Sequence, residues 1–291
     1  MSSDSFPIDP GYVRDLVKAC LSEDVGPGDL TAALTPDTKV HARLVCRQAA
    51  VVCGTPFFTA AFEQLDPGVT VHWHASDGDR VEPRDVVCEL NGRSRPILTG
   101  ERSAINLLQT LSGTATTVRS YVEAVRDTGV RILDTRKTIP GLRAAQKWAV
   151  LCGGGHNHRR GLFDGILIKE NHLRSGESIE DVTGRAQSAA PPGVPVTLEV
   201  ENLDQLARAL EAGARRVLLD NYSIEGLKQA VAMNRGRAEL EASGSVHLDN
   251  VRAIAETGVD CISIGALTKD LKAVDYSLQF DKVGNRERNR G

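Results

Sequence analysis

Four short apolar runs between residues 196 and 266 decide the fold, and each ends in polar or small residues: VTLEVEN at 196–202, RVLLDN at 216–221, AELEASG at 238–244 and VDCISIGA at 259–266. Two similar runs precede them, at 130–133 and 165–168. The last four recur about every 21 residues, and helical patterns lie between them, as at 203–212 and 224–233. Strands that alternate with helices in this way predict a parallel sheet with crossover helices.

Two architectures are consistent with this alternation: an open doubly wound sheet and a closed or partly closed barrel. The six runs fall within about 140 residues, whereas a complete eight-fold α/β barrel takes about 250. Residues 116–272 are therefore predicted to form an incomplete parallel α/β barrel. In both architectures functional groups gather at the carboxyl ends of the strands, so the position of the site does not depend on the choice.

Residues 1–115 have a different rhythm and predict a separate N-terminal α/β domain of the α+β sandwich-like kind. Short β-like runs separated by turn signals occur within 41–92. A helix is predicted over 13–21 and a long one over 100–125, where Gly113 allows a break. The C-terminal tail, residues 273–291, is a candidate to pack back on this domain.

Composition and charge narrow the class of protein. The 291 residues include 35 Lys and Arg against 38 Asp and Glu, a net charge of −3. A protein that coats nucleic acid would be basic overall, so nucleic acid is not an expected partner. No apolar run approaches the roughly 18 residues of a membrane helix, and the start MSSDSFPIDPGY lacks the features of a signal peptide. We expect a soluble, cytoplasmic protein with no membrane partner.

The cysteines show no metal-binding or redox spacing. No two are arranged as C-x-x-C, and none clusters with histidine at zinc-finger spacing. They lie mostly in apolar stretches, at Cys20, Cys46, Cys53, Cys88, Cys152 and Cys261. We interpret them as buried free thiols, with a catalytic or redox cysteine as the minor alternative.

Charged residues directly follow several of the apolar runs. Lys169, Glu199 and Asp220 each stand where a strand is predicted to end, which favours a functional site over ordinary solvent exposure. Two carboxylates beside a phosphate site typically hold Mg²⁺ or sugar hydroxyls. The last two runs end instead in small residues, at 243–245 and 265–266. Small residues let backbone N–H groups approach a phosphate, so these two ends predict a phosphate corner.

The segment 131–174 is strongly basic. It contains nine Lys or Arg and three His, opposed by three acidic residues, and it suits a small ligand with several negative charges. Arg143 and Lys147, four residues apart on a predicted helix, are interpreted as a solvated helix face. The glycines at 153–155 match no nucleotide-binding loop and predict a flexible turn. These residues together indicate an enzyme of phosphorylated sugars that acts with an acidic partner.

Longer motifs carry a resemblance to a known family. They are TGERSAIN at 99–106, DTRKTIPGLR at 134–143, CGGGHNHRRGLFDGILIKENH at 152–172, LEVENL at 198–203, LLDN at 218–221, LEASGSV at 240–246 and ISIGALTK at 262–269. In this order they resemble quinolinate phosphoribosyltransferase, the carboxylating nicotinate-nucleotide pyrophosphorylase of de novo NAD biosynthesis. The resemblance implies an N-terminal domain and an incomplete barrel. It also implies a homodimer or larger homo-oligomer, in which the N-terminal domain of one subunit caps the barrel of the next.

The resemblance implies a reaction and a set of site residues. Quinolinate and phosphoribosyl pyrophosphate, with Mg²⁺, would give nicotinate mononucleotide, pyrophosphate and CO₂. The quinolinate site would contain Arg136, His158, Arg159 and Lys169, with Arg102 reaching in from the neighbouring subunit. Lys137, Glu199 and Asp220 would be catalytic and would contact phosphoribosyl pyrophosphate, and the two acids are the possible Mg²⁺ ligands. The 5-phosphate would be bound by Ser243, Gly244 and Gly265, with Lys269 beside them.

Three alternatives stay open at this point. A related phosphoribosyltransferase could use another acceptor, as could a paralogue associated with molybdenum transport. A non-catalytic protein could bind anions or nucleic acid through the basic segment, although Glu199 and Asp220 argue against nucleic acid. A sugar-phosphate isomerase could use a similar barrel, but it would need an acid–base pair and no second anionic substrate.

Overall fold

The computed structural model describes residues 8–169 and 178–281, and within them the chain forms two compact units. Of these residues, unit 1 contains 8–116 together with 272–281, and unit 2 contains 117–169 and 178–271. None of the described helices is long and apolar enough to cross a membrane.

Unit 1 is built on an antiparallel sheet with strand order β12-β1-β5-β3. Its strands are β1 (Lys39–Cys46), β3 (Thr70–Trp73), β5 (Val86–Arg93) and β12 (Tyr276–Phe280). A second, two-stranded sheet pairs β2 (Ala50–Val51) with β4 (Arg80–Val81). Because β12 pairs with β1, the residues after the barrel return to the N-terminal unit.

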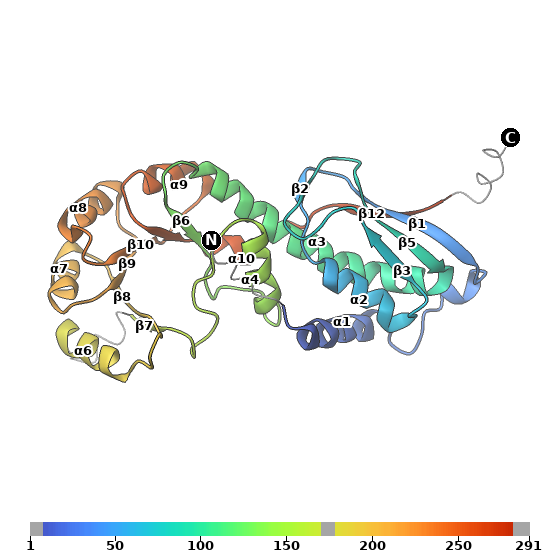
Figure 1. The fold of residues 1–291 in the computed structure, drawn as a ribbon, viewed down its shortest axis with the longest axis horizontal. Helices are drawn as coiled ribbons and strands as arrows, with labels where there is room; N and C mark the ends of the chain where they lie inside the picture. Colours follow the sequence, from blue (N-terminus) through green and yellow to red (C-terminus); the bar gives the residue numbers. More distant parts are fainter. Residues whose placement is uncertain (1–7, 170–177, 282–291) are drawn as a thin grey trace. The chain divides into compact units, whose positions relative to one another are not determined.

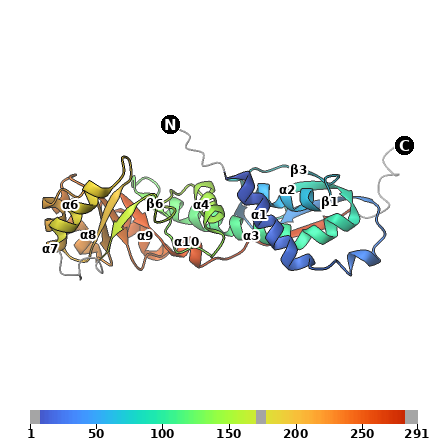
Figure 2. The same ribbon diagram turned by 90° about the horizontal axis from the view of Figure 1, so that it is seen from below.

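Helices cover this sheet. They are α1 (Pro10–Val25), α2 (Thr55–Leu65) and α3 (Ser94–Ala124), with a short 3₁₀ turn η1 (Ala32–Leu34). Helices α1 and α2 lie side by side in Figures 1 and 2. Helix α2 was not expected among the β-like runs; its Phe58 ring meets the ring of Trp73 at a centroid distance of 5.3 Å. Helix α3 continues through Gly113 without the break that its glycine allowed.

Unit 2 is the predicted parallel sheet. Its strands are β6 (Arg131–Leu133), β7 (Ile166–Ile168), β8 (Val196–Val200), β9 (Arg216–Asp220), β10 (Glu239–Ser243) and β11 (Cys261–Ser263), in the order β6-β11-β10-β9-β8-β7. Apart from the missing pair β6–β7, this is the cyclic order of a barrel, and it lacks the reversal of a doubly wound sheet. The prediction of an incomplete α/β barrel is therefore confirmed.

The crossover helices lie outside the row of strands, as Figure 1 shows for α6 (Ile179–Ala189), α7 (Leu203–Glu211), α8 (Ile224–Asn234) and α9 (Leu248–Ala255). Side chains define where three of them begin. Ser178, Asn202 and Ser223 each accept a hydrogen bond from a backbone N–H in the first turn. The caps Asn202 and Ser223 lie two and three residues after the ends of β8 and β9, so the loops between these strands and their helices are short. Helices α4 (Arg143–Cys152) and α10 (Ala266–Lys269) complete the unit.

The cysteines are free thiols, as predicted. Cys46, Cys53, Cys88 and Cys261 are buried, while Cys20 and Cys152 are half-buried. Burial raises the pKa of the Cys261 thiol to about 12 and raises that of Cys88 further. Thiolate, the reactive form, is therefore scarce at these buried positions at neutral pH.

Candidate functional site

A pocket of about 590 Å³ lies at the carboxyl ends of the barrel strands. Its lining comes from residues in the last part of the six strands or directly after them, together with His158 and Arg159 from the loop before β7. Nine of the predicted site residues line it: Arg136, Lys137, His158, Arg159, Lys169, Glu199, Asp220, Ser243 and Gly244. Residues separated by more than a hundred positions in the sequence therefore meet in one cavity.

Two arginines form one side of the pocket. The Nε atom of Arg136 is buried and has no hydrogen-bond partner. Arg159 donates from Nη1 to the Gly165 carbonyl at 3.0 Å. Burial, and next the positive charge of Arg136, lower the pKa of the Arg159 guanidinium. A buried unpaired donor and two neighbouring cations are both stabilised when an anion binds between them.

His158 connects the basic side to a buried acid. Its Nε2 lies 3.3 Å from Oε2 of Glu241, and its Nδ1 accepts a hydrogen bond from the Arg159 N–H at 2.7 Å. With Nδ1 as acceptor, Nε2 must carry the proton that faces Glu241. Glu241 is only 7% exposed, and its other oxygen, Oε1, is buried without a partner. A second polar atom in the pocket thus lacks the partner that a buried group requires.

Carboxylates also line the pocket. Glu199 lies near the end of β8, and Lys169 approaches it with an Nζ–Oε2 distance of 3.4 Å. Asp220 ends β9 and accepts a hydrogen bond from the Asn221 side chain at 3.0 Å. Glu199 and Glu241 both pair in register with Leu218 of the strand between them, so all three side chains point to the same face of the sheet.

Gly244 forms a tight corner after β10. Its φ of +93° is in the left-handed region, and a Cβ at this position would lie 2.1 Å from the Asn221 Oδ1 atom. Only glycine fits both constraints. The glycine therefore makes room for Asn221 beside the turn. Gly244 itself lines the pocket, where a backbone N–H can approach a phosphate.

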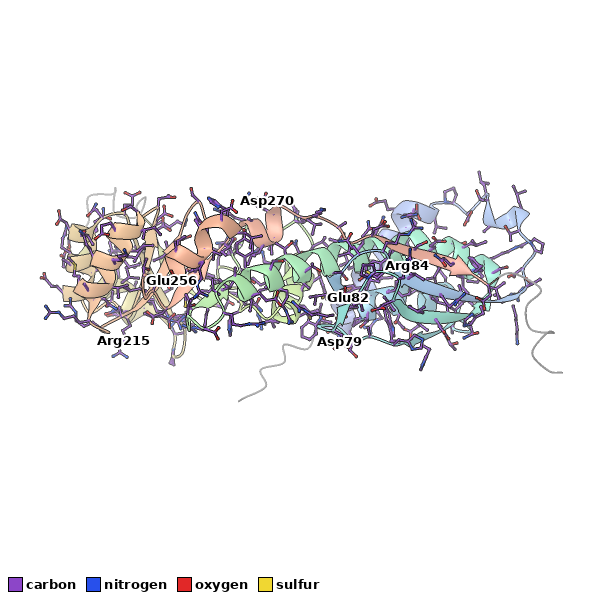
Figure 3. The ribbon with its side chains drawn as sticks, turned by 90° about the horizontal axis from the view of Figure 1, so that it is seen from above. Asp79, Glu82, Arg84, Arg215, Glu256 and Asp270 are labelled. Atoms are coloured by element: carbon purple, nitrogen blue, oxygen red, sulfur yellow. The ribbon has the colours of Figure 1, made fainter. Side chains whose placement is uncertain are left out.

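Three predicted residues lie outside the pocket lining. Arg102 is exposed on α3 within unit 1. Gly265 packs under Lys137, because a Cβ there would come within 2.9 Å of the Lys137 Cδ atom. Lys269 pairs with Asp270 at 2.7 Å; Asp270 is labelled in Figure 3 just beyond α10. The substrate contacts expected of these three residues stay predictions.

Two expectations about the basic segment were wrong. Lys147 is not on a solvated face: it is 1% exposed and its Nζ lies 2.5 Å from Oδ1 of the fully buried Asp134. Arg143 is half-buried and donates to the Arg136 and Arg160 carbonyls. The glycines at 153–155 are not a flexible turn, since their N–H groups bond to carbonyls of α4 and close its C-terminal end. Residues 170–174 of the basic segment lie outside the described part of the chain.

Glu241 is the charged residue of the pocket lining that was not among the predicted site residues. A signal was present, because Glu239, Glu241 and Ser243 alternate with the buried Leu240 and Ala242. Period-two alternation in a barrel strand places the polar set on the inner face. The prediction considered only residues at the strand ends, and Glu241 lies two residues before the end of β10.

Magnesium fits the acidic side of this pocket. Glu199 and Asp220 offer carboxylate oxygens from neighbouring strands, and Oε1 of Glu241 is an orphaned buried acceptor. Across the described residues, no three acidic or histidine side chains of the pocket converge into a cage of their own. This agrees with the preference of Mg²⁺ for one or two carboxylates together with substrate phosphates.

Known proteins share both units. The quinolinate phosphoribosyl transferase N-terminal domain model matches residues 29–112, and the C-terminal domain model matches residues 114–279. A probable nicotinate-nucleotide pyrophosphorylase [carboxylating] of Bacillus subtilis is 37% identical over 91% of this chain and 92% of its own length. The chloroplastic nicotinate-nucleotide pyrophosphorylase [carboxylating] of Oryza sativa is 38% identical over 94% of this chain and 80% of its own.

Among solved structures, the nicotinate-nucleotide pyrophosphorylase from Francisella tularensis has a TM-score of 0.92 at 44% identity. It covers 94% of this chain and 98% of its own. The likeness spans both units rather than the barrel alone. The chain belongs to the quinolinate phosphoribosyltransferase family.

Proposed function

We propose that the chain transfers phosphoribosyl from phosphoribosyl pyrophosphate to quinolinate with decarboxylation, yielding nicotinate mononucleotide, pyrophosphate and CO₂ in de novo NAD biosynthesis. The observation that carries the proposal is one pocket lined by basic side chains, among them Arg136 with its unpartnered Nε, by carboxylates and by the Gly244 turn. Its volume suits two small substrates side by side. The relatives from Bacillus subtilis and Oryza sativa are named nicotinate-nucleotide pyrophosphorylase [carboxylating], which is the enzyme name for this reaction.

The basic side would hold quinolinate. Two carboxylates on adjacent ring carbons need donors from more than one direction, and Arg136 and Arg159 supply planar forks that can bind them bidentately. His158, next to Arg159 in the loop before β7, and Lys169, directly after β7, complete this side. Because the Nε of Arg136 has no partner, a substrate carboxylate gives it one without breaking an existing hydrogen bond.

The acidic side would hold phosphoribosyl pyrophosphate. Glu199 and Asp220 would accept hydrogen bonds from the ribose hydroxyls, and Lys137 would meet the phosphates as a point charge. Ser243 and Gly244 would bind the 5-phosphate at the turn after β10, with Gly265 and Lys269 contributing nearby. Bound Mg²⁺, on Glu199 and Asp220, would supply neutralisation of the pyrophosphate charge.

The residues then account for the chemistry. The bond between ribose C1 and the pyrophosphate oxygen breaks, and the carboxylates of Glu199 and Asp220 stabilise the developing oxocarbenium ion. The quinolinate nitrogen forms its bond to C1 from the opposite face. The bond to the 2-carboxylate breaks next, because the cationic ring nitrogen stabilises the electron pair left on the ring carbon, which then takes up a proton. Holding both substrates in line is the main contribution of the protein.

A direct assay tests the reaction. The protein is mixed with phosphoribosyl pyrophosphate, Mg²⁺ and either quinolinate or nicotinic acid, and nicotinate mononucleotide and CO₂ are measured. We expect product in the mixture with quinolinate and none in the mixture with nicotinic acid. Product from nicotinic acid, or none from quinolinate despite binding of phosphoribosyl pyrophosphate, would contradict the proposal and point to another acceptor.

Replacing Arg136 by alanine should lower kcat/KM for quinolinate by roughly 10- to 100-fold, since a charge-assisted hydrogen bond contributes about 1.5–3 kcal/mol. The KM for phosphoribosyl pyrophosphate should change little. Arg215→Ala is the matched control, because Arg215 is exposed and directly precedes β9, whereas Asp220 at the other end of that strand lines the pocket. Arg215 is labelled in Figure 3. Unchanged quinolinate kinetics in Arg136→Ala would remove this arginine from the substrate site.

We further propose a homodimer or larger homo-oligomer in which Arg102 completes the pocket of a partner subunit, and a cytoplasmic location. Two features support assembly: Arg102 is exposed, and Leu162 and Phe163, close to Arg159 in sequence, are 76% and 79% exposed. Large exposed apolar side chains of this kind often mark protein interfaces.

Mixing two inactive variants tests the shared site. Arg102→Ala and Lys137→Ala damage residues that would come from different subunits, so a mixed dimer has one intact pocket. After subunit exchange at equal amounts, about a quarter of the wild-type activity should return. Absence of recovery, with mixed oligomers verified by mass spectrometry, would show that Arg102 acts within its own subunit or not at all.

A further inference from the structure

The polar face of α4 reaches the loops that form the pocket but does not line the pocket itself. Arg143, Gln146 and Lys147 lie on this face, and all three bond to loop backbone rather than to solvent. Gln146 is fully buried. Three long polar side chains of α4 thus form hydrogen bonds with backbone groups of the loops, and these bonds constrain the conformation of the loops.

Asp134 and Lys147 form hydrogen bonds with the backbone N–H and the backbone carbonyl of His158. Oδ1 of Asp134 accepts the His158 N–H at 2.8 Å, and Nζ of Lys147 donates to the His158 carbonyl at 3.0 Å. The pair itself is joined at 2.5 Å. The Asn157 side-chain amide, oriented to satisfy its neighbours, donates to the other Asp134 oxygen at 2.6 Å. Both peptide groups around His158 are therefore fixed by one ion pair.

Gln146 holds the other basic loop in a similar way. Its Oε1 accepts the Ile139 N–H at 2.8 Å, and its Nε2 donates to the Thr268 carbonyl at 2.8 Å. The Thr268 hydroxyl in turn donates to the Lys137 carbonyl at 2.8 Å. The loop after β6 is thus tied to α4 and α10.

A contribution to folding stability alone does not explain the buried ion pair between Lys147 and Asp134. Burial raises the pKa of Asp134 to about 6 and lowers that of Lys147, although each partner favours the charged form of the other. Well-packed apolar residues generally stabilise a core at least as well as a buried ion pair does. A pair that bonds three groups of one loop has a role that apolar residues could not perform.

We propose that Lys147 and Asp134 are positioning residues that fix the His158 backbone and thereby direct His158 and Arg159 into the pocket. Neither residue lines the pocket, so both act through the loop. For the effect on catalysis the inference rests on the proposed function, in which His158 and Arg159 bind quinolinate. Its effect on the loop does not depend on the substrate.

The test uses three variants: Lys147→Met, Asp134→Asn and the double variant. Each single change leaves one buried charge without its partner and risks unfolding. The double variant contains neither charge, so it separates folding from positioning. The same Lys→Met change at Lys228, an exposed lysine on α8 that pairs with Glu225, is the matched control.

Two readouts are measured on the folded double variant. Hydrogen exchange by mass spectrometry should be faster in peptides covering 156–161 than in wild type, with exchange in β8 and β9 unchanged. The KM for quinolinate should rise at least roughly tenfold, because small displacements of binding groups have large effects, while the KM for phosphoribosyl pyrophosphate stays within about twofold. Lys228→Met should change neither.

The outcomes separate this inference from the proposed function. Unchanged exchange at 156–161 would overturn the positioning role, whatever the kinetics. Faster exchange with unchanged quinolinate KM would overturn the catalytic part of it. If the wild-type protein fails to use quinolinate, the proposed function fails, and exchange at 156–161 still decides whether the pair fixes this loop.

Discussion

Replacing Asp220 by asparagine is expected to lower kcat/KM for phosphoribosyl pyrophosphate by roughly 10²- to 10³-fold, the range found when one group that stabilises transition-state charge is removed. Asp220 ends β9 within the pocket, and its carboxylate accepts a hydrogen bond from the Asn221 side-chain amide. Asparagine keeps the shape but removes the negative charge that would face the ribose hydroxyls and the developing oxocarbenium ion. Steady-state kinetics with each substrate varied in turn measure the effect.

An exposed acid on a neighbouring element provides the control. Asp204 lies in the first turn of α7, where Asp204→Asn removes a similar charge away from the pocket. It should leave both KM values within about threefold of wild type. A defect of Asp220→Asn confined to quinolinate would place this carboxylate on the other side of the pocket and would contradict its proposed role.

The sequence predicted the barrel well because its signals are local. Each strand is a short apolar run, and each polar end follows from chain direction, so Glu199, Asp220 and Gly244 could be assigned to one face before any coordinates. The register of parallel strands then brings them together in the pocket. The quinolinate side depended more on the family resemblance, since charge density alone did not separate Arg136 and Arg159 from their basic neighbours.

The role of α4 could not be predicted in this way. Lys147 lies four residues after Arg143, and on an isolated helix this spacing indicates a solvated face. In the fold Lys147 is buried and paired with Asp134, which directly follows β6, thirteen positions earlier in the sequence. A polar residue directly after the buried β6 was a hint, but its partner depends on tertiary packing. Helix α2 was not predicted, because its phenylalanine-rich sequence lies between β2 and β3 and was interpreted as part of the β-like region.

Gly113 was interpreted by propensity, and the structure assigns it a different role. Glycine in a helix interior is about 1 kcal/mol less favourable than alanine, which is why a break seemed allowed. Helix α3 is continuous there, and the chain before β12 crosses it closely: the Val274 N–H donates to the Gln109 carbonyl at 3.1 Å. Because Gly113 has no side chain, the backbone at Lys272 can pass close to α3, and the helix is not bent at this glycine.

Gly113→Ala is therefore expected to lower the free energy of unfolding by about 3 kcal/mol, in the upper part of the range for overpacked sites. A Cβ at this position would lie 2.3 Å from the Lys272 carbonyl oxygen and 3.0 Å from its carbon, both backbone atoms that cannot rotate away. The midpoint of urea unfolding measures the loss. Gly184→Ala in α6 is the control, because nothing lies within 4 Å of its Cβ and only the propensity gain of up to about 1 kcal/mol remains. Opposite signs for the two substitutions are expected; stabilisation by both would show that the segment before β12 can move aside.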